Sequence, residues 1–136
     1  MINAGNNNSP ATGSWGYPFA TEYITTSPFG GRISPITGLW EGHSGMDIGA
    51  PAGTAVLASK SGTVYNKYDP GGFGQYIVVN HGDGTESWYG HVRFSVKNGS
   101  FVNQGNKIGE VAAPGELGDS TTGAHLEFQI RIGGAP

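Results

Sequence analysis

The stretch GTVYNKYDPGGFGQYIVVNHGDGTESWYGH, residues 62–91, decides the fold class. It contains three runs that are rich in β-branched and aromatic residues, at 62–68, 75–80 and 85–91. The dipeptides Gly71-Gly72 and Asp83-Gly84 lie between the runs, and both are typical of tight turns between strands. The stretch therefore predicts three antiparallel strands that are joined by turns.

Further short runs of the same kind lie on both sides of this stretch, at residues 23–26, 55–58, 101–102, 107–111 and 125–131. In the last run the apolar residues occupy alternate positions, which predicts one buried face and one polar face. The buried face is Leu126, Phe128 and Ile130, and the polar face is His125, Glu127 and Gln129. Helical periodicity is missing from the sequence. We therefore expect an all-β protein, a single compact antiparallel β sandwich or barrel-like domain with long groove-forming loops.

The composition fits a compact domain and excludes several classes of protein. Only 12% of the 136 residues are charged, and the net charge is −3. Three Trp, six Tyr and six Phe supply bulk for a core, so disorder is not expected. Seven Lys and Arg residues give no basic surface for nucleic acid. No apolar run approaches the roughly 20 residues of a membrane span. The absence of cysteine excludes a disulfide scaffold and a Cys-ligated zinc site.

The first 13 residues, MINAGNNNSPATG, have the composition of a flexible linker. They show neither the charged start nor the apolar centre of a signal peptide. We expect the folded domain to span residues 14–136 and to be part of a longer protein.

Three of the four histidines lie in positions that suit chemistry. His43 precedes Asp47 by four residues, so on an extended segment both side chains point to the same face. His125 and Glu127 repeat this arrangement near the C-terminal end, and His91 ends the third run of the opening stretch. Imidazole and carboxylate groups in such patterns favour a first-row divalent ion, zinc above all.

Each of these patterns has a plain structural alternative. His43 and Asp47 are equally expected as a surface histidine beside a solvated carboxylate, and His125 and Glu127 as a polar strand face. His91 alone is more often a hydrogen-bonded structural histidine. His81 lies among turn residues, and we expect it to be structural.

The aromatic residues allow two interpretations, a substrate groove or a core. The residues concerned are Trp15, Tyr17, Trp40, Tyr68, Tyr76, Trp88 and Tyr89. In a small β domain the core is the more common location. The glycine-rich loop at 69–74 is a candidate groove wall, because glycine lets a substrate backbone approach closely, or else a long hairpin turn.

Taken together, the motifs resemble the lysostaphin-type (M23, LytM-like) zinc metallopeptidase domain. The resemblance extends over residues 14–132, in the order of the family's own motifs. It rests on SPFGGR (27–32), SPITG (34–38), HSGMDIGAPAGT (43–54), GQYIVVNHGDG (74–84), WYGH (88–91), VKNGSFVNQGNKIGEV (96–111) and STTGAHLEFQI (120–130).

The resemblance implies a site with one altered position. The family's zinc ligands fall on His43, Asp47 and the position that Glu127 holds here, where the family has histidine. Its catalytic histidines fall on His91 and His125. Carboxylate oxygen is an ordinary zinc donor, but two anionic ligands weaken the Lewis acidity of the ion. We therefore expect zinc to bind, with reduced affinity and rate, and Mn²⁺ is an alternative ion.

The resemblance also implies the function. We expect a monomeric, zinc-dependent endopeptidase that hydrolyses peptide stem or cross-bridge bonds of bacterial peptidoglycan. It would act outside the cell or at the cell wall, or as part of a lysin on a phage tail or from a prophage. The alternative is a catalytically disabled domain of the same fold, in which Glu127 replaces an essential ligand and the domain binds cell wall or a protein partner.

Overall fold

The computed structural model describes residues 15–21, 25–27, 32–33, 40–41, 46–70, 72–116 and 123–133. Within these ranges the regular secondary structure is β-strand throughout. The strands are β1 (Thr25–Ser27), β2 (Arg32–Ile33), β3 (Trp40–Glu41), β4 (Met46–Gly49), β5 (Ala55–Leu57), β6 (Gly62–Asp69), β7 (Gly74–Asn80), β8 (Thr85–Gly90), β9 (Val92–Phe94), β10 (Phe101–Val102), β11 (Lys107–Val111) and β12 (His125–Ile132).

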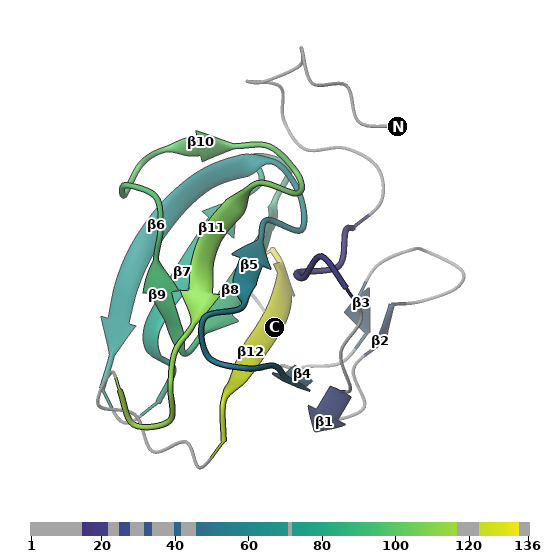
Figure 1. Cartoon of the computed structure of the whole chain (residues 1–136). Helices are drawn as coiled ribbons and strands as arrows, with labels where there is room; N and C mark the ends of the chain where they lie inside the picture. Colours follow the sequence, from purple (N-terminus) through teal and green to yellow (C-terminus); the bar gives the residue numbers. More distant parts are fainter. Residues whose placement is uncertain are drawn as a thin grey trace.

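The strands form a seven-stranded sheet in the order β1-β4-β12-β8-β7-β6-β10, a three-stranded sheet in the order β5-β11-β9, and the pair β2-β3. All pairings are antiparallel. Figure 1 shows β5, β11 and β9 lying across one face of the large sheet. The described part of the chain is therefore an antiparallel β sandwich, which confirms the expected fold class.

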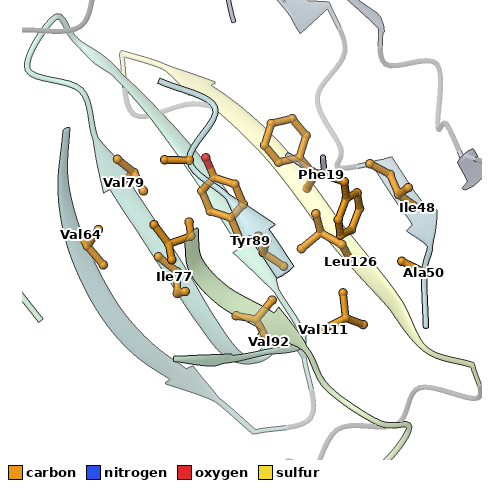
Figure 2. Packing of buried hydrophobic residues seen from close by; sticks show 14 of the residues in the cluster. Phe19, Ile48, Ala50, Val64, Ile77, Val79, Tyr89, Val92, Val111 and Leu126 are labelled. Atoms are coloured by element: carbon orange, nitrogen blue, oxygen red, sulfur yellow. The ribbon is translucent and has the colours of Figure 1, made fainter. Parts of the chain in front are cut away.

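The hydrophobic core lies between the two larger sheets (Figure 2). The small sheet contributes Val56, Val92 and Val111, all with no exposed surface. The facing side chains of the large sheet include Ile77, Tyr89 and Leu126, which are also fully buried. The alternation expected for β12 is confirmed, because Leu126, Phe128 and Ile130 are at most 5% exposed. Burial of alternate residues leaves the other face of the large sheet for polar side chains.

Four described strands were not expected from the sequence: β2, β3, β4 and β9. They have two to four residues each and are too short for a clear periodicity. The strand expected at 85–91 ends at Gly90, because His91 has a φ of 65° and the chain leaves the large sheet there. Val92 then begins β9 in the small sheet. A sharp turn at a histidine is a tertiary feature that local pattern does not reveal.

His81 is structural, as expected. Its Nδ1 lies 2.8 Å from the carbonyl oxygen of Ser61, and its Nε2 lies 3.0 Å from Oγ of Ser87. The hydroxyl of Tyr89 lies 2.6 Å from the same Oγ and accepts a hydrogen bond from the backbone N–H of Ser59, at 2.8 Å. Burial lowers the pKa of His81. This buried network joins His81, which follows β7, to β8 and to the segment before β6.

Some expectations concern residues outside the described ranges, or side chains that are not described. They include the linker at residues 1–13, the domain boundary at 14, the side chain of Trp40 and the expected ligand His43. The described residues contain no helix with the length and hydropathy of a membrane span.

Candidate active site

Asp47 and Glu127 face each other on the polar side of the large sheet. They are direct partners in the antiparallel pairing of β4 with β12. Their neighbours in sequence, Ile48 and Leu126, are fully buried on the core side, so strand alternation directs both carboxylates away from the core. Directly paired residues have Cβ atoms about 4.5–5.5 Å apart. The fold therefore brings together two carboxylates that are 80 residues apart in sequence.

His91 approaches this pair from the end of β8. Its Nε2 lies 3.3 Å from Oε1 of Glu127, and its side chain is only 7% exposed. Gly90, the residue before it, is the cross-strand partner of Glu127. The backbone N–H of His91 donates to the carbonyl oxygens of Phe73 and Gln75, at 2.9 and 3.0 Å. The imidazole is thus held at the end of the sheet, against the carboxylate.

His125, the first residue of β12, lies beside His91. Its Nε2 lies 3.8 Å from Oδ1 of Asp47, and its ring centroid lies 4.8 Å from that of His91. Its Nδ1 lies 2.8 Å from the carbonyl oxygen of Gly123. Because a carbonyl can only accept, this bond requires the proton on Nδ1 and leaves Nε2 of the neutral ring as an acceptor. That acceptor faces the site.

The electrostatics of the site favour a cation. Burial raises the pKa of Asp47 above its ordinary value, and the nearby charge of Glu127 raises it further, whereas His125 and His91 act in the opposite direction. Like charges directly opposite each other on a strand pair destabilise the sheet. A positive ion between the two carboxylates would remove this repulsion.

The donors present fit a divalent metal ion. Carboxylate oxygen and imidazole nitrogen are ligands of zinc, and oxygen-rich sets also suit manganese. Among the described residues, no three His, Cys, Asp or Glu side chains form a group that could hold a metal ion on their own. The third expected ligand, His43, lies outside the described residues. Of the five expected site residues, the structure thus brings together Asp47, His91, His125 and Glu127.

The aromatic residues divide between core, surface and site. Tyr89 is fully buried in the core, and Tyr68 is 58% exposed. Tyr76 and Trp88 stack on the polar face of the large sheet, with centroids 5.2 Å apart. Trp15 and Tyr17 instead help to line a largely apolar cavity of about 210 Å³, together with Met46, Ile48 and Phe128.

Sequence reasoning missed one residue beside the site, Phe73. A Cβ added at Gly90 would lie 2.5 Å from Cδ1 of this ring and 3.4 Å from Cβ of Glu127, so the ring fills the space over Gly90. Phe73 also packs against Tyr76 and Trp88, with centroid distances of 5.2 and 5.7 Å. The glycine-rich loop at 69–74, expected as a groove wall or a turn, was the available signal.

The chain is similar in sequence and in structure to known peptidases. Residues 41–136 match the family model described as peptidase family M23. The structure is similar to the crystal structure of a zinc-containing peptidase from Vibrio cholerae, with a TM-score of 0.71 and 29% sequence identity. The similarity covers 90% of this chain and 38% of that one.

Two curated relatives are similar in sequence. A protein named DD-carboxypeptidase/endopeptidase Mpg, from Neisseria meningitidis serogroup B, is 40% identical over 112 residues, which are 82% of this chain and 25% of that protein. A protein named peptidoglycan DD-endopeptidase ShyC, from Vibrio cholerae, is 33% identical over 108 residues, 76% of this chain and 23% of that protein. The chain thus spans about a quarter of the length of these relatives.

Proposed function

The chain belongs to peptidase family M23, and from this premise we propose that it is a zinc-dependent endopeptidase of bacterial peptidoglycan. It would hydrolyse peptide bonds in the stems or cross-bridges. A relative named as a peptidoglycan DD-endopeptidase and a structural neighbour described as a zinc-containing peptidase support the substrate class and the metal. The place of action would then be the cell wall, whether the protein is a secreted hydrolase or a phage or prophage lysin.

One structural observation carries the proposal. Two carboxylates and two imidazoles converge on the polar face of the sheet, where each imidazole faces one carboxylate, at 3.3 Å for His91 and Glu127 and 3.8 Å for His125 and Asp47. A salt bridge with a purely structural role needs only one acidic and one basic side chain. A cluster of four titratable side chains from the strands β4, β8 and β12 is more typical of an active site.

In this proposal His43, Asp47 and Glu127 hold the metal ion. When bound, zinc supplies Lewis acidity that polarises the scissile carbonyl and lowers the pKa of water. The two carboxylates donate oxygen ligands, which leaves manganese as an alternative occupant. The resemblance implies that Glu127 takes a position at which the family has histidine, so both affinity and rate would be lower than with an imidazole at that position.

The two histidines would divide the proton transfers between them. His125 is the better general base, because the carbonyl of Gly123 occupies its Nδ1–H and leaves Nε2 as the acceptor on the site side. His125 would accept a proton from the attacking water and later give it to the leaving amine. His91 would use its Nε2–H to stabilise the oxyanion of the tetrahedral intermediate.

The test is digestion of isolated peptidoglycan by the 136-residue chain, with and without a chelator, followed by mass spectrometry of the released fragments. Release that the chelator abolishes and zinc restores is the expected result, and the fragment masses identify the bond. Absence of release at every zinc concentration would overturn the proposal.

A second candidate function is a disabled domain that binds cell wall or a protein partner. Glu127 is the observation that favours it, because the resemblance implies a histidine ligand at this position. The Glu127→His variant discriminates the two candidates. If the chain is a disabled enzyme, this variant gains cleavage that the natural chain lacks, whereas a working enzyme cleaves before the substitution.

A further inference from the structure

His91 has a backbone conformation that its residue type disfavours. Its φ is 65°, and it is the only non-glycine residue with positive φ among those that the structure describes. Such a conformation persists in a folded protein only where the surroundings fix it, and it is often found at functional sites. The question is therefore which residues hold His91 in this turn.

Backbone hydrogen bonds hold the turn on both sides. The N–H of His91 is shared between the carbonyl oxygens of Phe73 and Gln75, and its own carbonyl accepts from the N–H of Ala112, at 3.0 Å. Phe73 is itself anchored, because its N–H donates to Oδ2 of Asp69 at 3.2 Å. Phe73 and the start of β7 thus hold the backbone at His91 in place.

The ring of Phe73 completes this support. It occupies the place where a side chain at residue 90 would begin, since a Cβ there would lie 2.5 Å from Cδ1 of the ring. On its other side the ring packs against Tyr76 and Trp88, and the guanidinium of Arg131 lies 3.6 Å from the ring centroid of Trp88. This stack keeps the ring over Gly90, directly beside His91.

We propose that Phe73 is a positioning residue for the reaction: its backbone and its ring together fix the left-handed turn at His91 and hold that imidazole against Glu127. Gly90 is the matching partner, because any side chain there would displace the ring. The inference rests on the proposed catalytic role of His91. It assigns to Phe73 no contact with the substrate.

The first test compares Phe73→Ala, Phe73→Tyr and the control Tyr68→Ala, which removes an exposed aromatic ring from the neighbouring strand β6. A displacement of about 1 Å in an active site can lower the reaction rate by up to about a hundredfold. We therefore expect Phe73→Ala to lower kcat by roughly 10- to 100-fold. KM and metal content should stay near those of the natural chain. Phe73→Tyr and Tyr68→Ala should keep kcat within about twofold. A raised KM with unchanged kcat would overturn the proposal, because it would make Phe73 a substrate contact.

The second test uses the pair Gly90→Ala and Gly90→Ala/Phe73→Ala. The added methyl group displaces the ring, so Gly90→Ala alone should lower kcat at least as much as Phe73→Ala. Removing the ring as well relieves the collision, so the double variant should be faster than Gly90→Ala. A double variant that is slower than both single variants would show independent effects and overturn the proposal.

A third measurement does not depend on activity. Hydrogen–deuterium exchange of the His91 amide, followed by NMR in metal-free protein, reports directly on the turn. We expect at least about tenfold faster exchange at this amide in Phe73→Ala, and unchanged exchange in Tyr68→Ala. If the natural chain releases no fragments, the proposed function fails, but the exchange rates still decide whether Phe73 holds His91. Unchanged exchange in Phe73→Ala would overturn the inference even in an active enzyme.

Discussion

Glu127 lies directly opposite Asp47 in the antiparallel pairing of β4 with β12, with both side chains on the polar face of the sheet. The two facing carboxylates repel each other and destabilise the metal-free protein. A cation that lies between them would attract both and remove this repulsion. The stability of the sheet and the occupation of the site are therefore coupled. This coupling can be measured without any substrate.

Replacement of Glu127 by Gln should have opposite effects on the metal-free and the metal-loaded protein. In chelator-treated protein we expect Glu127→Gln to raise the free energy of unfolding by about 0.5 kcal/mol, because the repulsion with Asp47 is removed. With zinc present the order should reverse, since each tenfold loss of affinity removes about 1.4 kcal/mol of metal-dependent stabilisation. Urea unfolding with and without zinc measures both effects.

Glu86→Gln is the control for this substitution. Glu86 lies on β8, where its carboxylate accepts a hydrogen bond from Nε1 of Trp88, at 3.0 Å. The same change of charge at residue 86 should not alter the difference in the free energy of unfolding between zinc-loaded and zinc-free protein. Equal zinc-dependent stabilisation of Glu127→Gln and the natural chain would show that Glu127 is not a ligand.

Replacement of His91 or His125 by alanine should remove cleavage, whereas the metal content should stay unchanged. We expect His125→Ala to lower kcat by about 10²–10⁴-fold, because it removes the proposed general base. His91→Ala should lower kcat by about 10²–10³-fold, because its proposed role is to stabilise the oxyanion. Metal analysis of the dialysed variants provides the control, and a variant with full turnover would remove that histidine from the mechanism.

The hydroxyl of Tyr89 should matter for stability and not for chemistry. Tyr89→Phe leaves the buried N–H of Ser59 without its acceptor, so we expect a loss of about 1–3 kcal/mol in the free energy of unfolding. Tyr68→Phe, on the exposed ring, should change it by less than about 0.5 kcal/mol. Urea denaturation of both variants tests the difference, and equal stabilities would contradict the role of the buried network.

His81 should make the domain less stable in mild acid. Burial lowers the pKa of this histidine below its usual 6.5, so the unfolded chain binds a proton at a pH where the folded chain does not. The contribution of neutral His81 to the free energy of unfolding is fully present above about pH 6.5. The free energy of unfolding then falls as the pH decreases towards the folded-state pKa, by at most about 1.4 kcal/mol per pH unit.

His81→Gln should have a flatter dependence on pH, although it is less stable at neutral pH because it disturbs the bonds to Ser61 and Ser87. The measurement is urea unfolding of metal-free protein between pH 7.5 and about pH 5.5, with the difference between natural chain and variant as readout. Parallel pH curves would show that His81 titrates normally in the folded protein.

Most of the strands were readable from the sequence. Strands β6, β7 and β8 were predicted because β-branched and aromatic runs alternate with turn dipeptides, which is local information. The polar and buried faces of β12 followed from alternation with period two. Even so, Gln129 on the polar face is only 8% exposed, because the packing of Arg131 and Trp88 on that face covers it.

The sequence by itself therefore determined the fold class, the direction of each side chain on β12 and the residue types available for catalysis, since all of these depend on neighbours in the chain. The tertiary structure alone decided that Asp47 faces Glu127, that His91 turns with φ of 65° at the crossing between two sheets, and that Phe73 lies over Gly90. The physical reason is that cross-strand register and close packing depend on segments far apart in sequence. The pattern of residues within one strand does not specify these contacts.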